Sequence, residues 1–161
     1  FELPVAIARP FNTYGPRQSA RAIIPTVMTQ ILSGKDKIQL GSAFPTRDFT
    51  FVKDTAEGIA AIAECDSLLG GVTNIGSNFE ISIEDLVNRI KKVANSNIEI
   101  QFDPSRARPE KSEVERLWAD ASRLEKNTSW KPQTSIDDGL NETFQWLGQY
   151  LERYKPDVYN K

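Results

Sequence analysis

Short apolar runs alternate with stretches of helical periodicity along most of the chain. The first run, residues 3–11 (LPVAIARPF), is apolar and partly β-branched, and it predicts a buried strand. The pattern then predicts a helix over about residues 22–32. Pro25 is tolerated because it falls in the first turn of that helix, and Gly34 supplies a stop after it.

A second helix is expected to begin at Asp54, a good N-cap residue, and to end near Cys65. Its apolar residues share one face, which we expect to be buried: Ala56, Ile59, Ala60 and Ala63. The glycine pair at 70–71 ends this region, and residues 72–75 predict a strand.

Three further short strands are predicted over residues 38–40, 48–52 and 98–102. The stretch from Asp103 to Glu115 is polar, contains two prolines and predicts a loop. A short helix is expected after Asp120.

Two serines mark the starts of the last two long helices. Ser82 opens a pattern that resembles a capping box, and Ser135 opens another. The expected buried faces are Leu86, Val87, Ile90 and Val93 in the first helix, and Ile136, Leu140, Phe144, Leu147 and Leu151 in the second. This order of strands and helices indicates an α/β or α+β fold.

Composition excludes several classes of function. The chain has 161 residues, 39% hydrophobic, with 20 basic and 22 acidic side chains, and its isoelectric point is near 5.3. Such a balance provides no basic surface for nucleic acid or an anionic membrane, and no apolar run approaches the length of a membrane span. The absence of histidine excludes histidine-based catalysis and metal binding. A single Cys65, expected to be a buried structural thiol, fits a reducing cytoplasm.

The segment from Arg9 to Arg17 runs from an apolar strand into a polar turn at Gly15 and Pro16. Ligands bind at the carboxyl ends of strands in open α/β sheets, so Asn12 and Arg17 are placed to reach one. The alternative is an ordinary strand exit in which Asn12 hydrogen-bonds to its own backbone.

Two more segments carry arginines beside rigid neighbours. The planar guanidinium of Arg47 suits a phosphate, although a surface ion pair with Asp48 or Asp54 is the alternative. Arg106 and Arg108 adjoin a proline and could clamp an anion, or lie in a solvated loop. The three arginine segments indicate an anion site only if they converge.

Six motifs in order resemble those of a known family: RPFNTYGPRQ, IIPTVMTQILSG, RDFTFVKDTAEGI, TNIG, RPEKSEVERLWAD and WKPQTSIDDGL. They are similar to extended short-chain dehydrogenase/reductases, and among these to NAD-dependent nucleotide-sugar epimerases and dehydratases. The closest resemblance is to UDP-sugar 4,6-dehydratases. The resemblance implies a Rossmann-type α/β fold whose C-terminal, substrate-binding part is residues 1–161. Residues 1–16 would be the last Rossmann strand and turn, and the N-terminal nucleotide-binding half is absent.

The resemblance also implies which chemistry this chain lacks. Members of the family carry a Gly-x-x-Gly-x-x-Gly turn for the NAD pyrophosphate and a Tyr-x-x-x-Lys pair for proton transfer, and neither pattern occurs here. In the complete enzyme, a tyrosinate would deprotonate the sugar 4-hydroxyl while hydride passes to NAD. Elimination of water or return of hydride to the opposite face then distinguishes dehydratase from epimerase. We therefore expect this chain alone to be inactive.

The residues that match the family motifs would bind substrate and the edge of the cofactor. Pro10, Phe11 and Asn12 would lie beside the nicotinamide, with Asn12 also bonding a substrate phosphate. Further substrate contacts would come from Ile24 and Pro25 near the uracil or ribose, Gln39 and Leu40 near the nucleotide, Arg47 and Arg108 on the diphosphate, and Asn74 on the nucleotide side. Arg17 and Glu110 would lie near the site, and Trp118 and Trp130 would be structural.

Two hypotheses of different class follow. In the first, the chain is the nucleotide-sugar-binding half of an NAD-dependent 4,6-dehydratase, or of an epimerase or decarboxylase of the same family, and the full enzyme is a homodimer. In the second, it is a non-catalytic binding module that reuses this half. In either case, a central strand exposed by the missing half leaves apolar surface and unpaired backbone groups, so we expect the chain to self-associate through residues 3–11.

Overall fold

The computed structural model describes residues 3–103 and 114–154, so the greater part of the expected 103–115 loop, including Arg106, Arg108 and Glu110, lies outside the described residues. Its α-helices are α1 (Ile23–Leu32), α2 (Val52–Ala63), α3 (Ile83–Val93), α4 (Ser122–Asn127) and α5 (Ile136–Gln149), and its short 3₁₀ helices are η1 (Asp66–Leu68) and η4 (Leu151–Arg153). Its strands are β1 (Ile7–Pro10), β2 (Thr13–Tyr14), β3 (Lys37–Leu40), β4 (Thr46–Asp48), β5 (Thr50–Phe51), β6 (Val72–Ile75), β7 (Glu80–Ser82), β8 (Glu99–Phe102) and β9 (Arg116–Leu117).

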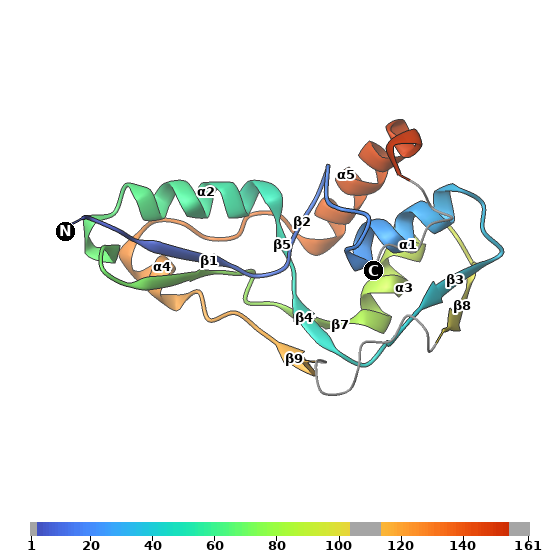
Figure 1. Cartoon of the computed structure of the whole chain (residues 1–161), viewed down its shortest axis with the longest axis horizontal. Coiled ribbons are helices and arrows are strands. Elements are labelled where there is room, and N and C mark those ends of the chain that lie inside the picture. Colours follow the sequence, from blue (N-terminus) through green and yellow to red (C-terminus); the bar gives the residue numbers. More distant parts are fainter. Residues whose placement is uncertain (1–2, 104–113, 155–161) are drawn as a thin grey trace.

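The elements form two regions joined by short strands (Figure 1). At one end, α2 and α4 flank the parallel pair β1–β6. At the other end, α1, α3 and α5 pack together beside the parallel pair β3–β8. Between them lie the parallel pair β2–β5 and the three-stranded sheet β7–β4–β9. The architecture is the mixed α/β arrangement that the sequence predicts.

The larger hydrophobic core fills the space between α1, α3, α5 and the short strands. Both long serine-capped helices are confirmed, because the Ser82 and Ser135 hydroxyls accept hydrogen bonds from the backbone N–H groups of Asp85 and Asp138. Leu86, Val87 and Ile90 are buried as predicted, while Val93 is partly buried. In α5, Leu140 and Leu147 are buried, whereas Ile136, Phe144 and Leu151 are half-buried.

The prediction of a buried strand over residues 3–11 is wrong in this chain. Strand β1 is only four residues long and pairs with β6 along one edge. Ala6 and Ala8 face the cluster beneath α2, but the alternating residues Leu3, Val5 and Ile7 are 73%, 53% and 53% exposed. The face that carries them is therefore open to solvent.

The expected strand over residues 48–52 is two strands with a break at Phe49. Strand β4 pairs with β7 and β9, whereas β5 pairs with β2. The chain changes partner at the break, and Phe49 itself is buried in the larger core. The break directs successive side chains of this segment to different parts of the molecule.

The N-cap residue of helix α2 is Phe51, three residues earlier than predicted, so Asp54 is not the cap. The carboxylate of Asp54 is buried and accepts hydrogen bonds from the backbone N–H groups of Gln133 (3.1 Å) and Thr134 (3.0 Å). The face predicted to be buried is also wrong, since Ala56, Ile59, Ala60 and Ala63 are exposed. The buried residues are Asp54, Thr55, Gly58 and Ile62.

A smaller hydrophobic cluster lies between α2, β6 and α4 and includes Trp130, whose indole N–H donates to the Asp54 carbonyl (3.0 Å). Trp130 is therefore structural, as expected. Cys65 packs at the edge of this cluster and is half-buried rather than buried, with its sulfur 3.2 Å from the Ser67 hydroxyl. Trp118 is exposed and stacks with the Arg116 guanidinium.

Candidate nucleotide-binding site

A cavity of about 330 Å³ opens where β3, β4 and the start of α1 meet. Its walls come from five separate segments of the chain: Asn12, Gln18, Arg21, Ala22, Ile23, Thr26, Gln39, Leu40, Gly41, Ser42, Pro45, Arg47, Phe49 and Ile83. Four residues singled out in the sequence line it, namely Asn12, Gln39, Leu40 and Arg47. Asn12 and Arg47 come from two of the three segments singled out as candidate anion sites, so those two segments meet at the cavity, while the third, with Arg106 and Arg108, lies outside the described residues.

Arg47 lies in the middle of β4, between two residues that anchor the strand. Side chains alternate along a strand, so Thr46 and Asp48 point away from the cavity wall that Arg47 lines. The Thr46 hydroxyl donates to the Glu80 carboxylate, which also forms a two-pronged ion pair with Arg116 (2.7–2.9 Å). These hydrogen bonds from Arg116 hold the pKa of Glu80 below its usual value.

The side chain of Asn12 is held at the carboxyl end of β1. The side-chain amide donates to the backbone carbonyl of Asp48 (2.8 Å), and the backbone carbonyl of Asn12 accepts from the Thr50 N–H (3.4 Å). The expected alternative, a bond from Asn12 to its own backbone, is not the arrangement observed. Asn12 instead connects the β1–β2 turn to the bend after β4 and faces the cavity.

Sequence reasoning missed Arg21, which is exposed and lines the cavity just before α1. The Thr26 hydroxyl hydrogen-bonds to the carbonyls of Ala20 (2.9 Å) and Ala22 (2.8 Å), which fixes the turn that carries Arg21. The preceding loop is also tied down, because the Tyr154 hydroxyl donates to the Gln18 carbonyl (2.8 Å). The available signal was a basic residue directly before the N-cap residue of a helix, Ala22.

The N-terminus of α1 forms part of the cavity wall through Ala22, Ile23 and Thr26. This ten-residue helix has neither a side-chain cap nor an acidic residue in its first turn. The first N–H groups of a helix lack intrahelical acceptors and carry partial positive charge. Together with the guanidinium groups of Arg21 and Arg47, this helix end makes the cavity suited to an anion such as a phosphate.

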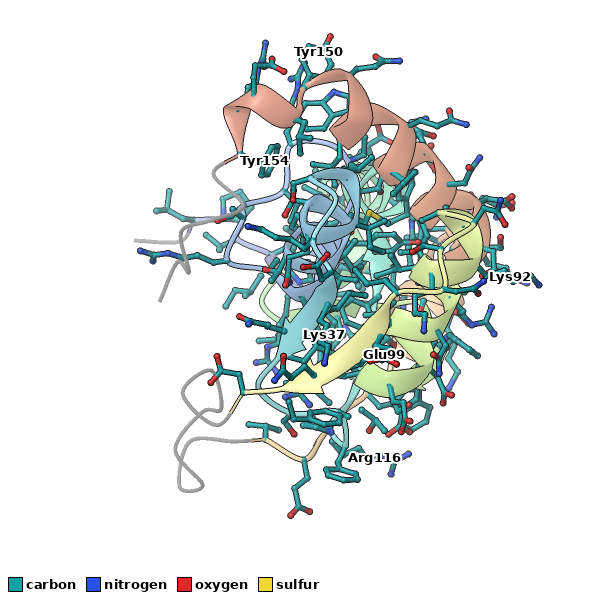
Figure 2. The ribbon with its side chains drawn as sticks, turned by 90° about the vertical axis from the view of Figure 1, so that its right-hand side faces the viewer. Lys37, Lys92, Glu99, Arg116, Tyr150 and Tyr154 are labelled. Carbon is teal, nitrogen blue, oxygen red and sulfur yellow. The ribbon has the colours of Figure 1, made fainter. Side chains whose placement is uncertain are left out.

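The opposite wall is the end of β3, where Gln39 and Leu40 lie. The buried Gln30 side chain of α1 accepts from the Gln39 N–H (2.9 Å), so it takes the place of a neighbouring strand. The other edge of β3 pairs with β8, and Figure 2 shows Lys37 and Glu99 beside each other on these strands, 3.9 Å apart. The wall is thus held on both edges and presents the apolar Leu40 next to polar groups.

Other residues predicted for the site lie elsewhere. Ile24 and Pro25 are buried behind the cavity wall, and their neighbours Ile23 and Thr26 line it instead. Asn74, on β6, donates its side-chain amide to the Asp120 carbonyl (3.1 Å) and is not part of the cavity.

Pro10 and Phe11 lie at the carboxyl end of β1, where the Phe11 N–H donates to the Ile75 carbonyl (2.9 Å). Arg17 is exposed in a left-handed backbone conformation (φ 69°) and does not line the cavity. Arg108 belongs to the stretch outside the described residues. Across the part that is described, no helix is long and apolar enough to cross a membrane.

Comparison with known proteins identifies the class to which this fold belongs. The chain is similar to NAD-dependent nucleotide-sugar dehydratases, epimerases and decarboxylases of the extended short-chain dehydrogenase/reductase type. The family described as GDP-mannose 4,6 dehydratase matches residues 1–143, so this chain belongs to that family.

Curated relatives include enzymes of several reactions. The chain is 35% identical over 151 residues to a UDP-N-acetyl-alpha-D-glucosaminuronate decarboxylase of Bacillus cytotoxicus, covering 90% of this chain and 46% of that protein. It is 26% identical over 160 residues to the human dTDP-D-glucose 4,6-dehydratase, covering 96% and 45%. The chain therefore spans about half the length of the curated relatives it matches.

Solved structures give the same result. UDP-glucuronic acid 4-epimerase from Bacillus cereus, in complex with UDP-glucuronic acid and NAD, matches with a TM-score of 0.84 and 30% identity, over 93% of this chain and 47% of that one. dTDP-glucose 4,6-dehydratase from Bacillus anthracis, in complex with NAD, matches with a TM-score of 0.85 and 29% identity, over 97% and 48%. The fold is thus that of part of a Rossmann-type enzyme.

Proposed function

We propose that this chain binds the nucleoside diphosphate part of a nucleotide sugar in the cavity between β3, β4 and α1. The observation that carries the proposal is the convergence of Arg21, Arg47 and the uncapped N-terminus of α1 on one cavity. Two guanidinium groups and a helix end supply charge for a diphosphate. The apolar side chains of Ile23 and Leu40, on opposite walls of the cavity, offer surfaces for a flat base.

Within this proposal, the predicted residues other than Pro25 and Asn74 have the following roles. Arg47 grips the diphosphate, with Arg108 as the second predicted contact, and Asn12 donates its remaining amide N–H to a phosphate oxygen. Gln39 and Leu40 lie along the nucleotide. Ile24 contributes through its backbone N–H at the helix start, because its side chain is buried in the core.

The chain provides only the rim of an NAD site. Pro10 and Phe11 sit at the carboxyl end of a parallel strand pair, where ligands of α/β sheets bind. The exposed Pro10 and half-buried Phe11 fit one face of a nicotinamide ring, and Asn12 adjoins them. The sequence has no glycine-rich turn for the dinucleotide pyrophosphate, so we infer that the other half of the parent protein holds most of NAD. NAD, when bound, supplies reversible hydride transfer with the sugar.

For the parent protein we propose an NAD-dependent nucleotide-sugar 4,6-dehydratase that acts through transient oxidation at carbon 4 of the sugar. In that enzyme residues 1–161 are the substrate-binding part, and residues 1–16 complete the Rossmann sheet. The names of its relatives favour a second candidate, a 4-epimerase or decarboxylase of UDP-sugars. In both candidates, diphosphate binding in this half holds the sugar in place for chemistry performed by the other half.

The binding proposal is tested by isothermal titration calorimetry of the chain with UDP, GDP and dTDP. We expect at least one nucleoside diphosphate to bind, and Arg47→Ala to weaken that binding by about tenfold or more, since charge-assisted hydrogen bonds are lost. Arg153→Ala is the matched control, because Arg153 lies on η4 away from the cavity. Absence of binding, or equal loss in both variants, would refute the proposal.

The reaction is tested on the parent protein by mass spectrometry of the nucleotide sugar after incubation with NAD. Loss of one water indicates a dehydratase, loss of carbon dioxide a decarboxylase, and an unchanged mass with altered chromatographic mobility an epimerase. If the parent protein binds the nucleotide sugar but leaves it chemically unchanged, the result would favour the non-catalytic binding module.

A further inference from the structure

Asp48 is a fully buried carboxylate on the strand that presents Arg47, with 0% of its surface exposed. One carboxylate oxygen accepts hydrogen bonds from the Ser77 backbone N–H (2.8 Å) and hydroxyl (2.7 Å). The other accepts from the Ala119 N–H (3.3 Å). Burying a carboxylate costs free energy unless hydrogen-bond donors satisfy it, as Ser77 and Ala119 do here. An apolar side chain at position 48 could not form these hydrogen bonds.

Three parts of the chain meet at this carboxylate. Ser77 lies in the turn between β6 and β7, and Ala119 lies between β9 and α4. Asp48 ties both to β4, the strand on which it lies. The backbone carbonyl of Asp48 in turn accepts the Asn12 amide (2.8 Å). Asp48 is thus connected to two residues that line the cavity. Its backbone carbonyl accepts from Asn12, and a peptide bond joins it to Arg47.

The guanidinium of Arg47 depends on the position of β4. One of its nitrogens donates to the carbonyl of Thr46 (2.8 Å), so the side chain is fastened to its own strand. Strand β4 has only three residues and ends at the bend of Phe49. A shift of Asp48 therefore moves the Arg47 guanidinium and the Asn12 amide together.

We propose that Asp48 is a positioning residue of the nucleotide site, which acts by holding Arg47 and Asn12 in the orientation that receives a diphosphate. This inference rests on the proposed function. The alternative is that Asp48 only stabilises the fold, and the chain offers a matched residue for comparison. Asp54 is 2% exposed and its carboxylate also accepts two backbone N–H groups from a distant loop. It differs from Asp48 in that its backbone carbonyl accepts from Trp130, which does not line the cavity, whereas the Asp48 carbonyl accepts from Asn12, which does.

The test measures UDP affinity by calorimetry and thermal stability for the unaltered chain and the variants Asp48→Asn and Asp54→Asn. We expect both variants to melt at lower temperature, because each loses a charged acceptor of backbone N–H groups. Only Asp48→Asn is expected to weaken UDP binding, by about tenfold, which corresponds to about 1.4 kcal/mol. Equal affinities in the two variants would overturn the inference while the proposed function stands. Failure of the unaltered chain to bind UDP would overturn both.

A milder pair keeps the test valid if Asp48→Asn does not fold. Ser77→Ala removes the hydroxyl bond to Asp48 and the hydroxyl's bonds to the backbone of Phe79 (3.2 and 3.3 Å). Ser67→Ala is the control, because it removes a hydroxyl bond to the Asn127 side chain (2.9 Å) and a contact with the Cys65 sulfur (3.2 Å), and none of these residues lines the cavity. We expect Ser77→Ala to weaken UDP binding by about threefold and Ser67→Ala to leave it unchanged. In ¹⁵N-resolved spectra, the side-chain amide signals of Asn12 should shift in Ser77→Ala alone. Unchanged Asn12 signals with unchanged affinity would leave Asp48 a purely structural residue.

Discussion

The hydroxyl of Tyr14 lies directly against the backbone of Gly139, which has no side chain to exclude it. Tyr14 is buried in the larger core and donates this hydroxyl to the carbonyl of Ile136 at the start of α5 (3.3 Å). Because Tyr14 follows Asn12 by two residues, the contact fixes how closely α5 approaches the strand next to the cavity.

We expect Gly139→Ala to destabilise the chain by about 1–3 kcal/mol, since an added Cβ would overlap the Tyr14 hydroxyl in a packed core. Gly148→Ala is the control in the same helix, because a Cβ there would meet only a Leu32 methyl at 3.8 Å. That change should stabilise the helix by up to about 1 kcal/mol through higher helix propensity. Urea denaturation measures both, and stabilisation by both changes would show that the contact is loose.

Burial raises the pKa of Tyr14 well above the ordinary value of 10.0, with further contributions from Asp54, Asp137 and Asp138. The folded state therefore holds the phenol proton more tightly than the unfolded state. Stability from this group is fully present below pH 10 and is lost as the pH rises toward the folded pKa. Denaturation curves should show the free energy of unfolding falling above about pH 10, by at most ~1.4 kcal/mol per pH unit from this residue. Tyr14→Phe should reduce that slope, and an unchanged slope would contradict the assignment.

Local sequence signals predicted the two helices that have a serine as N-cap residue. In each, the serine hydroxyl accepts a hydrogen bond from the backbone N–H three residues later, and this local contact defines the helix start. Local signals misplaced α2 for the opposite reason. Asp54 is satisfied by Gln133 and Thr134, about eighty residues away, which no local pattern reveals. Gly58 lets α2 approach Ile75 closely, so a face with a glycine is buried and the alanine-rich face is exposed.

Arg47 was singled out from its local segment, and Leu40 only through the resemblance to a known family; both line the cavity. On α1, the expected contacts fell one residue away from those that line the cavity, because each step along a helix turns the side chain by about 100°. Ile24 therefore points into the core, and Ile23 and Thr26 point into the cavity. Arg21 was missed because its position depends on the Thr26 hydroxyl holding the preceding turn.

Arg21→Ala should weaken UDP binding and make it less sensitive to salt, because one cation facing the diphosphate is removed. Uridine, which has no phosphate, is the control ligand, and its affinity should be the same in the variant and the unaltered chain. Calorimetry at two salt concentrations measures the change. An equal loss of uridine affinity would mean that Arg21 contacts the nucleoside or supports the fold.

The ion pair between Glu80 and Arg116 should be visible in an acid titration. Hydrogen bonds from Arg116, and then from Thr46, lower the pKa of Glu80 below 4.5. Its contribution to stability is present above the unfolded pKa and is lost as the pH falls through the folded pKa. In Arg116→Met, the pKa of Glu80, followed by carboxyl ¹³C shifts, should rise toward its ordinary value. An unchanged pKa would show that Thr46 alone holds the carboxylate.

The open face of β1 leads to a prediction about assembly. Leu3, Val5 and Ile7 are exposed, and within the part of the chain that the structure describes β1 pairs only with β6. An unpaired strand edge beside an apolar surface is a template for another strand. We expect the chain to self-associate at high concentration in sedimentation velocity experiments. Ile7→Lys should restore monomers by placing a charge on this face, whereas Ile59→Lys, on the exposed face of α2, should not. A strictly monomeric unaltered chain, or equal rescue by both variants, would argue that the β1 edge does not drive assembly.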